Sequence, residues 1–258
     1  MALHPGKLIA YWLAGWIPGG RRHCVACRHA VWRFMPYRKG SRGLPPLMRA
    51  LAIVGSDVDH FECPRCGAND RERHLLLYMQ ASGLLDALPG ASVLHFAPEK
   101  RLVRVIADRR PALHVRCDLY PTTSDIQRVD IQCMPFANDS FDLLLANHVL
   151  EHVDAPDLAL AEIHRVLKPG GHAILQTPFS AKLHATWEDA GVDTPEARLQ
   201  AFGQEDHVRL FGRDIVDRIA KPGLVPRVQT HEALLAGCDA LRQGVNSAEP
   251  FFLFRKAD

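Results

Sequence analysis

The chain has 258 residues, of which 47% are hydrophobic and 23% charged, a composition of globular rather than disordered or fibrous proteins. This length is enough for one full α/β domain and a smaller module. The formal net charge of +2 gives no reason to expect a polyanionic partner, and the short basic clusters Arg21–Arg22 and Arg38–Lys39 with Arg42 are interpreted as solvated surface.

The first apolar stretch, LIAYWLAGWI, covers residues 8–17 and is too short to span a bilayer, which takes about 20 residues. Only Lys7 precedes it and no cleavage pattern of small residues follows, so a secretory signal is not expected. We expect an amphipathic helix that packs on the protein itself, with weak membrane association as the alternative and no transmembrane segment.

Seven cysteines are present, and four of them form two C-x-x-C pairs: Cys24, Cys27, Cys63 and Cys66. This pattern is typical of metal binding in a reducing compartment, so the cytoplasm is the expected location. Two such turns can place four thiolates around a structural zinc ion. The gap between the pairs is long, and nearby imidazoles could replace a cysteine ligand: His23, His29 and His60. A redox pair, or no metal, is the alternative.

From residue 70 onward helical and strand patterns alternate, as βαβ units require. Asn69 or Asp70 can cap a helix over 71–88, and Asp154 and Gly170–Gly171 are expected to bound a later helix over 154–171. Seven strands are expected at 91–96, 112–120, 128–131, 141–148, 172–179, 224–230 and 250–256, and further helices at 99–108 and 212–223. The predicted fold class is α/β, with a doubly wound seven-stranded sheet.

The block DIQCMPFANDSFDLLLANHVLEHVDAPDLALAEIHRVLKPGGHAILQTPF, residues 130–179, closely resembles class I S-adenosylmethionine-dependent methyltransferases of the type 11 kind. The cysteine pairs, CPRCGANDRERH and HFAPEK also resemble a bacterial subfamily with an N-terminal zinc ribbon. The resemblance implies a Rossmann-like methyltransferase domain over 85–258, after a helix and zinc-ribbon module over 1–84. Its implied cofactors are S-adenosylmethionine and structural zinc.

Ligands of an open α/β sheet bind at the carboxyl ends of its strands. With the resemblance, this predicts that Asp118 accepts hydrogen bonds from the ribose and that Asp130 faces the adenine. The full predicted cofactor site is His95, Phe96, Ala97, Glu99, Asp118, Leu119, Asp130, Ile131, Asn147 and His148.

The stretch VLHFAPEK, residues 93–100, departs from the family pattern of an acidic residue followed by spaced glycines. Here His95 stands at the acidic position, while Ala97 and Glu99 stand at glycines. A small Ala97 still permits close approach of the methionine moiety. Glu99 is expected either to reach the cofactor ammonium or to favour the start of the following helix.

Methyl transfer needs a base only for a weak nucleophile, so no universal catalytic motif exists. In a helix begun near His148, that residue, Glu151 and His152 would share one face. This resembles the E-x-x-E-H set that binds a divalent cation in ubiquinone-pathway O-methyltransferases, with His148 in place of the first carboxylate. Packing against the structure or cofactor is the alternative interpretation.

A long segment over about 180–211 is interpreted as a lid-like insertion over the acceptor site. It contains Asp206 and His207, an adjacent pair able to supply a general base, with helix capping and surface charge as the alternative. Together with His152 they are the predicted catalytic residues.

The favoured prediction is a methyltransferase that acts on an oxygen of a small molecule, or of a glycan or cell-envelope precursor. Two alternatives stay open: a nucleic-acid methyltransferase that binds through the zinc ribbon, which the charge disfavours, and an inactive zinc-dependent scaffold. The acceptor and the oligomeric state are not predictable from these residues.

Overall fold

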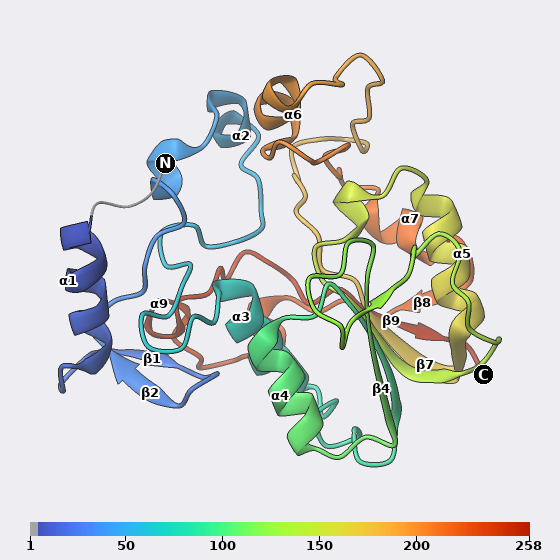
Figure 1. The fold of residues 1–258 in the computed structure, drawn as a ribbon. Helices are drawn as coiled ribbons and strands as arrows, with labels where there is room; N and C mark the ends of the chain where they lie inside the picture. Colours follow the sequence, from blue (N-terminus) through green and yellow to red (C-terminus); the bar gives the residue numbers. More distant parts are fainter. Residues whose placement is uncertain (1–4) are drawn as a thin grey trace.

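The computed structural model describes residues 5–258, with the side chains of residues 5, 7 and 8 left out. Its centre is a seven-stranded sheet in the order β5-β4-β3-β6-β7-β9-β8 (Figure 1). The strands are β3 (Ser92–Phe96), β4 (Leu113–Asp118), β5 (Gln127–Arg128), β6 (Phe141–Ala146), β7 (Leu167–Ile174), β8 (Leu224–Pro226) and β9 (Leu253–Lys256). Neighbouring strands of this sheet are parallel except at β9, which runs antiparallel to both of its neighbours. The predicted doubly wound fold is confirmed.

Helices cover both faces of the sheet. The helices α3 (Asp70–Ala81) and α4 (Lys100–Asp108) pack on one face, and α5 (Pro156–Val166) and α7 (Ile215–Ala220) on the other. A hydrophobic core lies on each face of the sheet. Successive side chains of β6 pack alternately into one core and the other, because neighbouring side chains of a strand point to opposite faces. Leu144 packs toward α5, whereas Leu143 and Leu145 pack toward α3 and α4, so this strand is buried on both sides.

Several predicted boundaries are wrong in detail. α5 begins at Pro156 with Ala155 as its N-cap, so Asp154 is not the cap. Gly170–Gly171 do not end that helix but lie inside β7. The expected helix at His148 is only a 3-10 turn, η2 (Leu150–His152). α3 ends at Ala81, with the expected cap Asn69 in a reciprocal capping box with Glu72.

The N-terminal segment is built from α1 (Pro5–Trp16), the hairpin β1 (Arg22–Cys24) and β2 (His29–Val31), η1 (Gly40–Gly43) and α2 (Pro46–Ala50). α2 packs on α6 (Pro195–Phe202), which belongs to the 180–211 insertion. Two short helices, α8 (His231–Leu234) and α9 (Ala240–Gln243), precede β9. Within residues 5–258 no helix is both long and apolar enough to cross a bilayer. The division at residue 84 stays a prediction, and α3 packs in the core of the sheet.

Candidate active site and metal centre

The loop after β3 keeps a glycine-like backbone without a glycine. Ala97 has a φ of 47°, in the left-handed region that favours glycine. Its N–H donates to the carbonyl of Cys117, which ties the loop to the end of β4. The turn that the cofactor loop of a nucleotide-binding fold requires is therefore present, at the cost of backbone strain at Ala97.

Glu99 lies at the centre of the carboxyl edge of the sheet. Its carboxylate accepts a hydrogen bond from His95 Nε2 at 2.9 Å and another from Asn147 Nδ2 at 2.6 Å. Burial alone would raise the pKa of Glu99, but these hydrogen bonds outweigh it and hold the pKa below its ordinary value. The carboxylate is thus ionised at neutral pH although its side chain is only 12% exposed.

The start of α4 does not use Glu99. Glu99 is the N-cap of that helix, yet its side chain makes no capping hydrogen bond. Instead Glu72 of α3 accepts from the N–H groups of Arg101 at 2.8 Å and Leu102 at 3.4 Å. The Glu99 side chain thus makes no capping hydrogen bond, and its role toward the cofactor stays a prediction.

Two buried polar atoms beside Glu99 lack a partner among the described residues. They are Asn147 Oδ1 and His95 Nδ1. Such orphaned groups are costly unless a ligand or water pairs with them. Asn147 Oδ1 and the Glu99 carboxylate are both acceptors, so these two groups fit a cationic donor such as the ammonium group of a methionine moiety.

The two predicted adenosine contacts follow the next strands along the sheet. Asp118 ends β4 and accepts from the Tyr120 N–H at 2.8 Å, and Asp130 accepts from the Gln132 N–H at 2.9 Å. Beside them, Ile131 is buried and Leu119 is 41% exposed. Leu119 is thus exposed at this part of the edge, whereas the Glu99 side chain is only 12% exposed.

The predicted catalytic residues lie together, although they are far apart in the chain. His152 Nδ1 lies 3.3 Å from Asp206 Oδ2, and the His152 and His207 rings meet edge to face with centroids 4.8 Å apart. Glu151 adjoins them, buried at the start of the same turn. The sequence placed Asp206 and His207 as a pair, but in the structure it is Asp206 and His152 that pair.

The same neighbourhood could hold a divalent cation. Glu151, His152 and His207 each offer one ligand atom, and these atoms lie within 4.8 Å of one another. His207 Nδ1 is bonded to the Phe202 carbonyl and His152 Nδ1 to Asp206, which leaves Nε2 of each ring to take a proton or a metal. His148 is not part of this set, contrary to the predicted shared face, because it turns inward.

His148 belongs to a buried network of histidine and glutamate side chains. It has a φ of 55°, and its Nδ1 lies 3.2 Å from Glu151 while its Nε2 lies 3.7 Å from Glu249. Glu249 also accepts from His74, which bonds to His231 at 2.9 Å. Burial and Arg71 would lower the pKa of His148, but the two carboxylates outweigh them and raise it. No spacing in the sequence indicates this network of side chains, because its members are up to 175 residues apart.

We expect Glu249→Gln to destabilise the protein by about 3 kcal/mol at pH 6, since a buried cation loses its partner. The pKa of Glu249 is lowered: burial opposes ionisation, and hydrogen bonds from His148 and His74 favour it more strongly. Its contribution is therefore present above the ordinary carboxyl pKa of about 4.3 and is lost as the pH falls through the folded value. The raised pKa of His148 gives a contribution that is present below about pH 6.5 and lost as the pH rises through its folded value.

Urea unfolding at pH 3, 6 and 9 tests this expectation. The difference between wild type and Glu249→Gln should be largest at pH 6 and shrink on both sides. Glu232→Gln, an exposed carboxylate on α8, is the matched control and should change little. A difference that does not vary with pH would contradict the assignment.

The four cysteines of the two C-x-x-C pairs meet in one cluster. Their sulfurs lie within 4.8 Å of one another, and Cys24 Sγ lies 3.7 Å from Cys66 Sγ. Four sulfurs around a zinc ion at about 2.3 Å are separated by about 3.8 Å. The candidate imidazoles face elsewhere: His23 toward Gln243, His29 toward the Cys27 carbonyl and His60 toward Asp57. The cluster fits a closed structural zinc site of four thiolates.

Arg73, fully buried on α3, lies beside this cluster. Among the described residues its guanidinium donates to five backbone carbonyls and forms no ion pair with a carboxylate; these carbonyls belong to His60, Phe61, Ala68, Gln243 and Gly244. Burial lowers the pKa of Arg73, and the field of the cysteines opposes that shift. A zinc ion with four thiolates carries a net charge of about −2, so it would balance the buried guanidinium.

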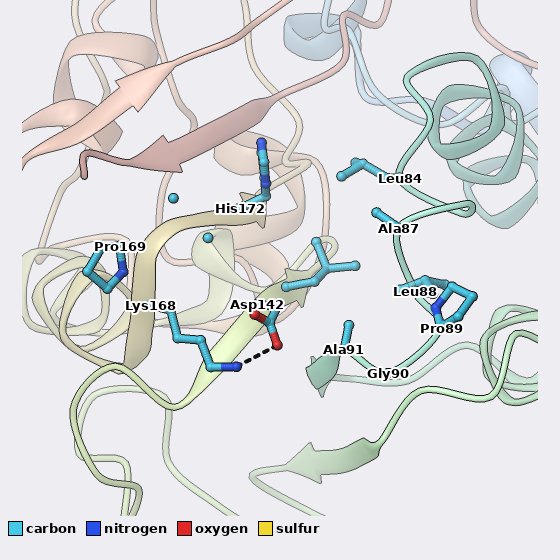
Figure 2. Close-up of a pocket in the computed structure, with 13 residues that line it drawn as sticks. Leu84, Ala87, Leu88, Pro89, Gly90, Ala91, Asp142, Lys168, Pro169 and His172 are labelled. Carbon is cyan, nitrogen blue, oxygen red and sulfur yellow. Dashed lines mark hydrogen bonds and ion pairs between the residues drawn. The ribbon is translucent and has the colours of Figure 1, made fainter.

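A surface pocket lies at the amino ends of the strands, at the end of the sheet opposite to Glu99. Figure 2 shows Leu88, Pro89 and Gly90 facing Lys168, whose Nζ lies 2.7 Å from Asp142 Oδ2. These residues surround the amino ends of β3, β6 and β7, away from the Glu99 edge. Since ligands of such sheets bind at the carboxyl ends, we do not assign the cofactor to this pocket.

A sheet of this order, with its candidate binding residues on the carboxyl edge, defines a Rossmann-like methyltransferase fold. Residues 80–175 match the family described as "Methyltransferase domain". Over this segment the chain is similar to that family.

Two proteins are similar to parts of this chain. An uncharacterised 37.1 kDa protein of transposon Tn4556 from Streptomyces fradiae is 30% identical over 113 residues, which cover 44% of this chain and 28% of that protein. Malonyl-[acyl-carrier protein] O-methyltransferase of Erwinia billingiae is 31% identical over 96 residues, or 36% of this chain and 38% of that protein. The chain thus spans well under two thirds of either relative.

Among solved structures, an S-adenosylmethionine-dependent methyltransferase from Mesorhizobium loti matches with a TM-score of 0.47 and 17% identity. The match covers 69% of this chain and 96% of that chain.

Proposed function

We propose that the protein is a methyltransferase that uses S-adenosylmethionine to methylate an oxygen atom of a small acceptor. The observation that carries the proposal is the ionised Glu99, 12% exposed, beside the unpaired Asn147 Oδ1, at the strand ends where this fold binds its ligand. The O-methyltransferase named among the relatives supports oxygen as the acceptor atom, and a glycan or cell-envelope precursor remains within the proposed class.

In this proposal, different residues of the chain bind different parts of the cofactor. S-adenosylmethionine supplies an activated methyl group when bound. Glu99 and Asn147 accept from its ammonium group, Asp118 accepts from the ribose hydroxyls, and Asp130 faces the adenine. Enclosure of Glu99 excludes water from the methionine half, which strengthens these charged contacts.

His152 is proposed to remove the acceptor's proton. Its Nδ1 is held by Asp206, so Nε2 would be free to accept the proton of an acceptor hydroxyl. The neighbouring Glu151 is ionised, because hydrogen bonding from His148 outweighs burial and lowers the pKa of this carboxyl group. Burial lowers the pKa of His207, which supports its neutral form.

Calorimetry with S-adenosylhomocysteine tests the cofactor assignment. We expect micromolar binding to the zinc-loaded protein, and Asp118→Ala should weaken it at least about 30-fold, since a hydrogen bond to a charged group contributes about 2 kcal/mol. Asp86→Ala, an exposed carboxylate paired with Arg109, should bind like the wild type. Absence of binding in the intact protein would refute the proposed activity.

A further inference from the structure

The helix α1 carries an exposed apolar stripe. Ile9, Trp12, Leu13 and Trp16 follow the i, i+3, i+4, i+7 spacing of one helix face, and they are 61%, 58%, 42% and 50% exposed. Ile17 and Trp32 extend the stripe, and Trp32 Nε1 donates to the Ile17 carbonyl at 3.1 Å. Side chains of this size are exposed together only rarely unless a partner covers them.

The opposite side of α1 is already packed. Ala14 and Gly15 are buried, and a Cβ at Gly15 would lie 3.2 Å from the Pro64 carbonyl carbon and the Arg65 nitrogen. The helix therefore uses its small residues to contact the second cysteine turn. The stripe is on the other, exposed side of α1, which lies at the margin of the molecule in Figure 1. The predicted packing of this helix on the protein thus accounts for one face and leaves the large apolar residues uncovered.

The charge of the chain is strongly uneven. The first 56 residues contain nine Lys and Arg and no Asp or Glu, so the other 202 residues hold 22 basic and 29 acidic residues. The net charge of +2 conceals this division. Two arginines stand over the aromatic rings of α1, Arg65 at 4.3 Å from Trp16 and Arg33 at 4.6 Å from Tyr11. Cations therefore border the apolar stripe directly.

We propose that this face docks on a negatively charged phospholipid membrane, with α1 lying in the plane of the interface. Tryptophan is favoured at the boundary between headgroups and acyl chains, and Ile9 and Leu13 would enter the acyl layer. The surrounding arginines would meet anionic headgroups. At 12 residues α1 is about 18 Å long, too short to span the bilayer and suited to lie on it.

Other occupants fit the face less well. A second copy of the chain would bring two strongly basic modules together, which like-charge repulsion opposes. A nucleic acid would satisfy the arginines, but the aliphatic part of the stripe gains nothing from phosphates. A membrane that contains anionic lipid can bind both the apolar side chains and the arginines of this face.

Vesicle flotation with the full chain tests the proposal. We expect binding to vesicles of phosphatidylglycerol and phosphatidylcholine, with a blue shift of tryptophan fluorescence, and binding at least about tenfold weaker to phosphatidylcholine alone. Ile9→Ser with Trp12→Ser should reduce partitioning at least about tenfold. These two side chains are the most exposed of the stripe, so zinc content and circular dichroism should stay unchanged.

The matched control is Leu158→Ser with Leu241→Ser, which removes two equally exposed apolar side chains outside the stripe and should leave vesicle binding intact. Equal partitioning of the Ile9→Ser, Trp12→Ser variant and the wild type would overturn the proposal. So would a concentration-dependent dimer that the same variant abolishes, or binding to RNA in the absence of any binding to anionic vesicles.

Discussion

Cys63→Ser is expected to remove the bound zinc and to lower the free energy of unfolding by at least about 3 kcal/mol. Cys63 is 1% exposed, and its sulfur belongs to the cluster of four. A structural zinc ion contributes to folding directly, since the site does not exist in the unfolded chain. Elemental analysis should find one zinc per chain in the wild type and much less in the variant, and thermal unfolding should show the lost stability.

Cys133→Ser is the matched control, because Cys133 is an exposed free cysteine outside the cluster. It should keep the zinc and the wild-type stability. Wild-type protein that contains no zinc, or a Cys63→Ser variant as stable as the wild type, would contradict the metal assignment.

A variant of Arg73 provides a second test of the bound zinc. If zinc and four thiolates balance the buried guanidinium, chelation should destabilise the wild type more than an Arg73→Met variant, which no longer holds the unbalanced cation. Arg73→Met itself should cost about 3–5 kcal/mol, because the five carbonyls lose their donor. The coupling between the two changes distinguishes zinc from a cluster of neutral thiols.

The sheet could be predicted because each buried strand is an unmistakable apolar run between turns, as in FDLLLA of β6. The residues at which the helices and strands begin and end could not be predicted in the same way. Gly170–Gly171 look like a helix end, but they lie in β7 because the strand pairing reaches back to Leu167. Here tertiary pairing overrides the local preference of glycine for a cap.

The carboxyl-edge residues could also be predicted, because strand ends in a parallel sheet share one edge. What the sequence could not indicate is how the groups pair. His152 bonds to Asp206, 54 residues away, and Glu249 reaches His74 across 175 residues. Buried partners of this kind are chosen by packing, and sequence distance carries no information about them. The charge division at residue 56 was visible in the sequence and was masked by the overall net charge.

Glu99→Gln is expected to weaken S-adenosylhomocysteine binding at least about 30-fold while the fold is largely retained. The ionised carboxylate would lose its attraction for the ammonium group, worth about 2 kcal/mol in an enclosed site. The fold tolerates the change because α4 is capped by Glu72 instead.

The measurement is calorimetry alongside thermal unfolding, with Glu196→Gln, an exposed carboxylate on α6, as control. Since the pKa of Glu99 is lowered, wild-type affinity should hold from pH 7 down past its ordinary value of about 4.3 and fail only below it, as long as the protein stays folded. A Glu99→Gln variant with wild-type affinity would show that this carboxylate serves the protein's own packing. If the Glu99→Gln variant is less stable but binds with unchanged affinity, Glu99 has a structural role. The cofactor ammonium would then have to be held by backbone carbonyls of the Ala97 turn.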